Sequence, residues 1–114
     1  MIILVCGGRH YHDYEAVKRA LDAIKGRGID LVIHGDASGA DRLGKAWADE
    51  NGIHHAAVPA LWHRLGRKEA GPKRNRAMLL LQPAMVVAFP GRSGTADMVR
   101  AAESAGVVVW RPYE

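Results

Sequence analysis

The stretch IILVCGGR at residues 2–9 is a short apolar run that ends in two glycines and an arginine. The same form recurs in IDLVIHG at residues 29–35 and in AMVVAFPG at residues 84–91. Short apolar runs bounded by glycine are typical of strands that are buried on both faces of a parallel sheet. The glycine that closes each run predicts a tight turn at the carboxyl end of the strand.

Amphipathic stretches separate these runs, and their apolar residues follow helical spacing. The sequence predicts helices over residues 14–25, 39–50, 71–81 and 95–105. It predicts strands over residues 2–6, 29–34, 53–58, 84–89 and 107–110. Residues 59–71 are expected to be the least regular stretch of the chain. Gly71 followed by Pro72 is typical of a helix start, where proline is tolerated.

Alternation of five strands with four helices predicts an α/β fold, namely an open, Rossmann-like parallel sheet with helices on both faces. The expected strand order is 3-2-1-4-5, which makes the first and fourth strands neighbours. Ligands of such folds bind beyond the carboxyl ends of the strands at that point. The chain of 114 residues is expected to form a single domain over residues 1–114.

The composition is that of an ordinary globular protein, with 48% hydrophobic and 25% charged residues. No apolar run reaches the roughly 18 residues that span a bilayer, so no membrane partner is expected. Cys6 is the only cysteine, which excludes an intrachain disulfide and suits a reducing compartment. The sequence therefore predicts a cytoplasmic protein, with Cys6 as a small core residue.

Positive charge is concentrated in one segment. The chain carries a net charge of +4, yet residues 64–76 alone hold six Lys or Arg residues against a single acid, Glu69. Such a segment predicts an anionic partner, either a small phosphate compound or nucleic acid. Lys73, Arg74 and Arg76 fall at an expected helix start, where cations oppose the helix dipole. A bound anion would relieve this repulsion, and a solvated basic face is the alternative.

Three glycine-rich turns follow the first, second and fourth expected strands and should lie on one rim of the sheet. Glycine permits close backbone approach to a ligand, and a helix N-terminus offers N–H groups to phosphate. The expected ligand-binding residues are Gly7, Gly8, Arg9, Gly35, Asp36, Ser38, Asp41, Arg74, Asn75, Pro90, Gly91, Arg92, Ser93, Gly94 and Thr95. Ordinary strand-to-helix turns would explain any one of the three, but their common edge favours a phosphate site. The sequence contains neither a Walker A loop nor the G-x-G-x-x-G dinucleotide motif.

Several side chains have two interpretations. Asp41 and Asp97 fall in the first turns of expected helices, where the dipole favours an acid, and Ser38 with Asp41 resembles a capping box. Either carboxylate could instead hydrogen-bond a ribose or a base. His34 is expected to be a satisfied core histidine, and Trp62 either packs or stacks on a base. The histidines show no metal-ligand spacing, so neither a metal nor a cofactor is expected.

Four ordered motifs carry a resemblance to a known family. They are VCGGR at residues 5–9, HG with GAD at 34–35 and 39–41, AGPKRNRAM at 70–78, and FPG with GTADM at 89–91 and 94–98. Together they resemble the SLOG superfamily, the Rossmann-like fold shared by DNA-processing proteins and LOG phosphoribohydrolases, and within it the single-domain YspA or DUF2493 branch. The resemblance implies a nucleotide or nucleotide-derived ligand whose phosphate is held by the loop after the fourth strand. It also implies a homodimer or higher homo-oligomer.

Some residues depart from the family pattern. The LOG enzymes cleave the base from a nucleoside monophosphate with an Arg on the third helix and a Glu in a P-G-G-x-G-T-x-x-E motif. Arg74 keeps the first position, whereas Met98 stands at the second, with Asp97 one residue earlier. The other departures from the family pattern are Arg92, Asp36 and Ser38.

The sequence leaves three functions open. The first is binding or sensing of a nucleotide-type phosphate ligand, which the departures from the family pattern favour. The second is a nucleotide N-glycosidase, in which Arg74 would steady the phosphate or leaving base and Asp97 would stabilise positive charge on the ribose. The third is single-stranded nucleic-acid binding through the basic segment and Trp62.

Overall fold

The computed structural model describes residues 1–113 as a five-stranded parallel sheet in the order β3-β2-β1-β4-β5. This confirms the expected fold class and strand order. The strands are β1 Ile2–Cys6, β2 Leu31–His34, β3 His54–Ala57, β4 Met85–Ala88 and β5 Val108–Trp110. Because all five strands run the same way, their carboxyl ends and the turns that follow them lie along one edge.

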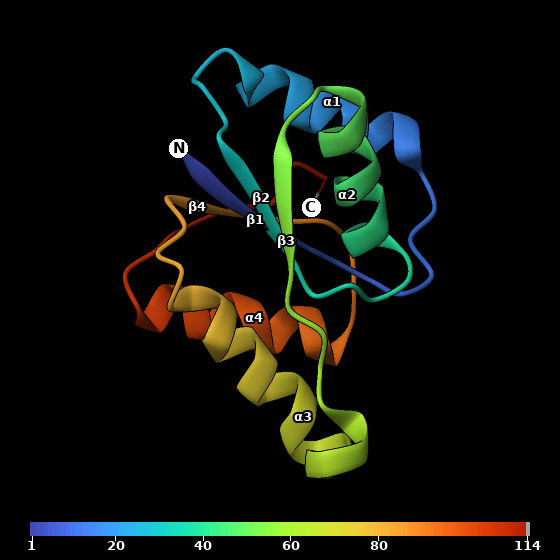
Figure 1. Cartoon of the computed structure of the whole chain (residues 1–114), viewed down its shortest axis with the longest axis vertical. Helices are drawn as coiled ribbons and strands as arrows, with labels where there is room; N and C mark the ends of the chain where they lie inside the picture. The colour runs from blue at the N-terminus through green and yellow to red at the C-terminus, as the bar shows by residue number, and fades with distance from the viewer. Residues whose placement is uncertain (114) are drawn as a thin grey trace.

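Two helices cover each face of the sheet (Figure 1). On one face lie α1 Tyr14–Lys25 and α2 Ala40–Glu50, and on the other lie α3 Trp62–Leu79 and α4 Ser93–Ser104. Alternate residues of β1 serve the two layers, since Ile3 and Val5 face α1 and α2 while Leu4 and Cys6 face α3 and α4. β1 is therefore buried on both faces, as its continuous apolar sequence predicts.

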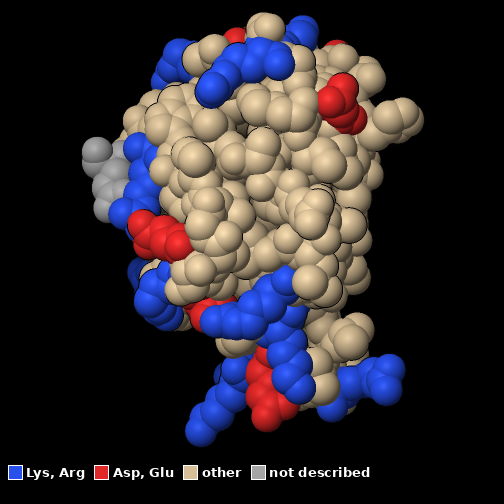
Figure 2. Space-filling view, turned by 90° about the vertical axis from the view of Figure 1, so that its left-hand side faces the viewer, with Lys and Arg blue, Asp and Glu red and all other residues tan. Residues whose placement is uncertain are grey.

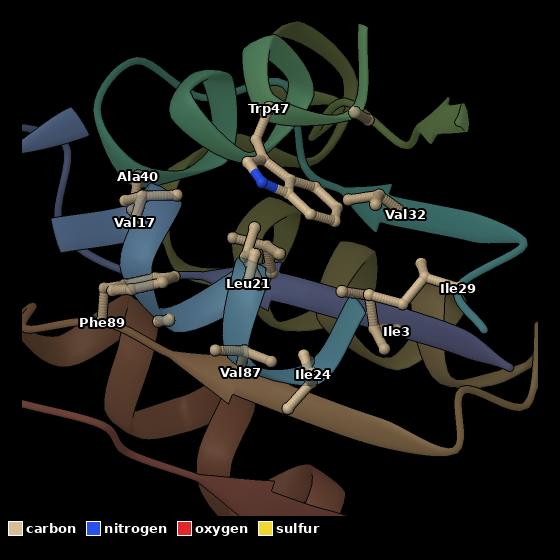
Figure 3. Packing of buried hydrophobic residues seen from close by; sticks show 13 residues of the cluster. Ile3, Val17, Leu21, Ile24, Ile29, Val32, Ala40, Trp47, Val87 and Phe89 are labelled. Atoms are coloured by element: carbon tan, nitrogen blue, oxygen red, sulfur yellow. The ribbon is translucent and has the colours of Figure 1, made fainter. Parts of the chain in front are cut away.

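The core beneath α1 and α2 is built around Trp47 and Leu21, which are fully buried (Figure 3). The indole ring reaches from α2 over β2, where it packs against Val32. Its Nε1 donates a hydrogen bond of 2.9 Å to Asp22 Oδ1 on α1, so the polar atom of the ring is satisfied. This bond also ties α1 to α2.

The core beneath α3 and α4 is built from small and flexible apolar side chains, including Cys6, Met78 and Met98. Burial raises the pKa of the Cys6 thiol to about 12, so the thiol stays protonated and unreactive at neutral pH. Met98 occupies the position at which the resemblance would place a catalytic Glu, and its side chain is buried. At this position the chain has a packing residue.

Helix α3 differs from the prediction, which placed an irregular stretch before a helix start at Gly71 and Pro72. The helical span runs from Trp62 to Leu79 and is kinked at Gly66, whose φ of 77° and ψ of 177° divide it into a first turn and a longer second segment. Pro72 lies inside the helix, where it removes one backbone hydrogen bond without ending it. Packing of the helix on α4, and of Met78 in the core with Leu4 and Cys6, thus outweighs the local preference of proline.

This difference corrects the argument about cations at the helix start. Lys73 and Arg74 lie in the interior of α3, and Arg76 lies in its last turn. A cation in the last turn is favoured by the helix dipole. The dipole therefore gives no reason to expect an anion at these three residues.

The remaining differences are small. Helix α4 begins at Ser93, so Ser93, Gly94 and Thr95 form its first turn. Strand β1 has the expected bounds, and the other four strands are shorter than the predicted ones by one to two residues at an end. No helix within residues 1–113 has the length and apolarity needed to cross a bilayer.

Candidate functional site

The turns that leave β1 and β4 are in direct contact. Gly8 N–H donates a hydrogen bond of 2.9 Å to Pro90 O. A Cβ added to Gly91 would lie 2.8 Å from Gly8 N and would also collide with Thr95 Oγ1. Neither glycine tolerates a side chain without displacing the facing turn, so glycine at both positions holds the two turns together.

The turn after β2 joins the same cluster. Ala40 N–H, at the start of α2, donates a hydrogen bond of 3.1 Å to Gly8 O. Gly39 has a φ of 82°, and a Cβ there would collide with Gly8 O and lie 2.6 Å from the Arg9 carbonyl carbon. The three glycine-rich turns are therefore interlocked at one rim, as their positions in the sequence predict.

Asp41 organises the turn after β2 from within. Its Oδ2 accepts hydrogen bonds from Gly35 N–H at 2.9 Å and Ala37 N–H at 3.3 Å, and the side chain is buried. Burial raises the pKa of Asp41, against the opposing effects of these backbone donors and of Arg74. Asp41 has the structural role that the sequence left open, although not as a capping box. The residue before α2 is Gly39, which has no side-chain cap, and Ser38 is exposed.

Arg74 reaches from α3 to the carboxyl end of β2. Its Nη1 donates a hydrogen bond of 2.8 Å to Gly35 O, and its Nε donates one of 3.0 Å to Asn75 Oδ1. A Cβ on Gly35 would collide with this guanidinium group. Burial lowers the pKa of Arg74, Asp41 raises it, and the positive charge of Arg9 lowers it further. The positive charge of Arg9 therefore disfavours the charged form of Arg74 at this rim.

Asn75 and Asp97 connect α3 to the start of α4. Asn75 Nδ2 donates to Asp97 Oδ2 at 3.0 Å and to Gly94 O at 3.3 Å. Arg76 Nη1 donates to the same carboxylate at 3.1 Å. Burial raises the pKa of Asp97, but the donors on Asn75 and Arg76 outweigh it and the net change is downward. Asp97 is therefore an ionised carboxylate already engaged by two side chains of α3.

The start of α4 presents unsatisfied backbone donors. Arg92 is the residue before the helix and provides no side-chain cap. No hydrogen bond joins the N–H groups of residues 91–95 to an acceptor within residues 1–113. Such a helix end carries partial positive charge and offers several N–H groups to an anion.

A cavity of about 280 Å³ opens beside this helix end. Its lining residues are Ala88, Phe89, Pro90, Gly91, Arg92, Thr95, Ala96, Val99, Arg111 and Tyr113. Among the described residues that line it there are two arginines and no carboxylate, and the floor is apolar. The cavity is of a size for a phosphate-bearing fragment of a nucleotide.

Arg111 and Tyr113 are residues of this cavity that the sequence analysis did not single out. Both follow β5 directly, and a position just after a parallel strand places a residue on the same edge as the three turns. That rule could have found them, but no glycine marks the turn. Tyr113 OH donates a hydrogen bond of 2.6 Å to Ala16 O on α1, which brings the segment after β5 across the edge of the sheet.

The other expected residues lie outside this cavity. Asp36 has a φ of 56° and lies 3.8 Å from Arg42 Nε, an exposed ion pair. His34 is fully buried and hydrogen-bonded to His55 and to the Asp36 N–H, as expected of a satisfied core histidine. Residues 1–113 contain no group of three or more His, Cys, Asp or Glu side chains that could hold a metal ion.

Comparison with known proteins relates the chain to a family and to a phage protein. The model of the YspA, cpYpsA-related SLOG family matches residues 1–65, which span β1 to the first turn of α3. The chain is also similar to the Gene 61 protein of Mycobacterium phage D29, with 35% identity over 120 residues that cover 94% of this chain and 92% of the phage protein.

Proposed function

Because the chain belongs to the YspA, cpYpsA-related SLOG family, whose members bind or process nucleotide-related ligands, we propose that it binds a nucleotide or nucleotide-derived phosphate compound. The site is the carboxyl edge of the sheet, where the turns after β1 and β4 meet. The protein acts as a binder or sensor of this ligand, in a reducing, cytoplasmic compartment.

The cavity at the start of α4 carries this proposal. It combines N–H groups that have no acceptor within residues 1–113 with two arginine side chains and an apolar floor. Arg92 is exposed, and no ion pair joins it to a carboxylate of the described chain. The free N–H groups at the start of α4 and the Arg92 guanidinium match the oxygens of a phosphate group, and the apolar wall matches a sugar or base.

The same geometry favours binding over hydrolysis. A carboxylate that stabilises a developing positive charge on ribose must face the ligand, whereas Asp97 is engaged by Asn75 and Arg76. The next residue, Met98, points into the core. Neither position supplies the carboxylate that an N-glycosidase needs beside the ribose.

A second candidate function is supported by the surface at the start of α3. Figure 2 shows Lys and Arg side chains gathered around the narrow end of the molecule, which is formed by the projecting start of α3 in Figure 1. The exposed cations there are Arg64, Arg67, Lys68 and Lys73. This surface suits a phosphate backbone, and binding of a single-stranded oligonucleotide would weaken steeply as salt rises.

Calorimetric titration tests the main proposal. The ligands are AMP, ADP, ADP-ribose, ribose 5-phosphate and a cyclic dinucleotide, each added to the wild-type chain and to Arg92→Ala. At least one ligand is expected to bind, and Arg92→Ala is expected to weaken it by about tenfold or more, because a charged hydrogen-bond donor to phosphate is lost.

The matched control is Arg27→Ala. Arg27 is exposed in the turn after α1, at the opposite edge of the sheet, so its removal makes the same change of charge far from the site. It is expected to leave the affinity within about twofold of wild type, since only screened long-range charge is lost. Equal weakening in both variants, or no binding by any of the five ligands, contradicts the proposal.

Release of free base from AMP separates a binder from a hydrolase. The wild-type chain is expected to release none above the buffer control. Enzymatic release that disappears in Asp97→Asn would instead assign the glycosidase function.

A further inference from the structure

Trp62 is an exposed aromatic ring that contacts Arg9 in the turn after β1. It opens α3 at the projecting end of the molecule (Figure 1), and its side chain belongs to neither core cluster. Its exposure is 38%, whereas Trp47 is fully buried and Trp110 is half-buried. Packing against Gly71 covers part of the ring, since a Cβ added to Gly71 would lie 3.6 Å from Trp62 Cη2. The rest of the ring is open to a stacking partner, the alternative that the sequence left open.

Arg9 connects this ring to the rim. Its guanidinium carbon lies 5.2 Å from the centroid of the Trp62 ring, in the geometry of a cation–π contact. The backbone of Arg9 packs against Gly39, and its neighbour Gly8 donates to Pro90 O. One end of Arg9 is thus fixed where the three turns meet, and the other end lies over the indole.

The charge of Arg9 has no acidic partner within residues 1–113, since no ion pair includes it. It lies near a second cation, Arg74, whose pKa is lowered by burial and further by the charge of Arg9. The indole face is what holds Arg9 in the absence of an anion. An anionic ligand at the rim offers a stronger interaction than this contact, because a charge-assisted hydrogen bond exceeds an exposed cation–π pair.

We propose that Trp62 and Arg9 form the base-binding end of the ligand site, an inference that rests on the proposed function. The nucleobase stacks on the indole ring in the place now taken by the Arg9 guanidinium, and Arg9 turns toward the ligand phosphate. The ligand is therefore a compound with an aromatic base, not a sugar phosphate or inorganic phosphate. Stacking of one base on an aromatic side chain contributes about 1–3 kcal/mol, which is roughly a tenfold to hundredfold gain in affinity.

Tryptophan fluorescence tests this directly, because the exposed ring of Trp62 is the one that a base would contact. AMP and ribose 5-phosphate are titrated into the wild-type chain, Trp62→Leu and Trp62→Phe. In wild type, AMP is expected to quench the emission and to bind about tenfold more tightly than ribose 5-phosphate. Ribose 5-phosphate has a phosphate but no base to stack, so it is expected to displace Arg9 from the ring without quenching the emission as AMP does.

Trp62→Leu is expected to reduce AMP affinity to that of ribose 5-phosphate and to leave ribose 5-phosphate affinity unchanged. Trp62→Phe keeps an aromatic face and is expected to restore most of the AMP affinity. Thermal unfolding of both variants controls for the fold, and an exposed residue outside the cores is expected to change stability little.

Two results overturn the inference in distinguishable ways. If AMP and ribose 5-phosphate bind equally well, or if Trp62→Leu weakens both alike, the phosphate site stands and the base-stacking role of Trp62 is wrong. If neither compound binds wild type, the proposed function fails and this inference fails with it.

Discussion

Gly35 shows how a single residue sets the position of a candidate ligand-binding side chain. Arg74 crosses the end of β2 because Gly35 leaves room for its guanidinium group and offers its carbonyl oxygen at 2.8 Å. A methyl group at this position would push the guanidinium off the carbonyl and break this half-buried hydrogen bond. Arg74 and Gly35 therefore form one structural unit.

Gly35→Ala is expected to lower the free energy of unfolding by about 1–3 kcal/mol, because a half-buried hydrogen bond is broken and a side chain is displaced. Urea denaturation measures it. The control is Gly26→Ala, since Gly26 has a helical φ of −61° and nothing lies within 4 Å of an added Cβ. Gly26→Ala is expected to leave stability unchanged or to raise it by up to about 1 kcal/mol. Equal effects of the two substitutions would contradict this account of Arg74.

His34 has a defined protonation state. Its Nδ1 accepts from the Asp36 N–H at 3.0 Å, so the proton of the neutral ring sits on Nε2, which donates to His55 Nδ1 at 3.2 Å. Burial, followed by the neighbouring His55, lowers the pKa of His34 to about 4. Protonation of Nδ1 would break the hydrogen bond from the Asp36 N–H, which holds the turn after β2.

This shift predicts how stability depends on pH. In the unfolded chain His34 takes up a proton near its usual pKa of 6.5, whereas in the folded chain it does so only near pH 4. Stability from His34 is therefore present above about pH 6.5 and is lost as pH falls toward 4, by up to about 3 kcal/mol. The measurement is the free energy of unfolding at pH 7 and pH 5, in wild type and in His34→Asn. The decrease from pH 7 to pH 5 is expected to be smaller in the variant, and an equal decrease would show that His34 is not responsible.

At the scale of whole elements, the sequence predicts the sheet better than it predicts α3. The strands are predictable because buried parallel strands leave continuous apolar runs, and glycines such as Gly7 and Gly35 mark the turns. The start of α3 is not predictable in this way. The helix buries few residues, among them Ala70, Asn75 and Met78, so it leaves no clear apolar periodicity, and Pro72 gives a false start.

Pro72 provides a test of where α3 begins. In the interior of a helix, proline removes a hydrogen bond and is less favourable than alanine. Pro72→Ala is therefore expected to raise the free energy of unfolding by about 1–2 kcal/mol, after allowance for the more flexible unfolded chain. Pro59→Ala, in the exposed segment before α3, is the control and is expected to give no increase. No increase in Pro72→Ala would support a helix that starts at Pro72.

The candidate site, like the fold, is predictable from the sequence only in part. The contact between the turns after β1 and β4 follows from strand order, which the sequence predicts. The cavity beside α4 does not follow from strand order. Arg111 and Tyr113 line it because of the path that the chain takes after β5, which the sequence does not predict. The interactions of Asp97 are likewise set by the position of α3, which local sequence does not determine.

At the scale of the whole molecule, the amino edge of the sheet also has exposed side chains to account for, and two of them are apolar. Leu80 is 82% exposed and Val108 is 60% exposed, and Val108 pairs with Met85 where β4 begins, shortly after Leu80. We propose that a second copy of the chain covers Leu80 and Val108, in line with the homo-oligomer that the resemblance implies.

Sedimentation analysis checks this proposal. The wild-type chain is expected to sediment as a dimer or larger assembly, and Leu80→Glu is expected to shift it to the monomer, because a charge would be buried in the interface. Leu61→Glu is the matched control, since Leu61 is also exposed, at 50%, but lies before α3. A monomeric wild-type chain, or equal dissociation by both substitutions, contradicts the proposed interface.

The central claim is that the turns after β1 and β4 form a phosphate-binding edge. Amide chemical-shift mapping of the isotope-labelled chain during titration with AMP tests it most directly. The amides of Gly8, Arg9 and residues 91–95 are expected to shift, while those of Gly28 and Gly106, in the turns that enter β2 and β5 at the opposite edge, are expected to stay in place. Shifts at the amino edge, or none at residues 91–95 while AMP is bound, would contradict the claim.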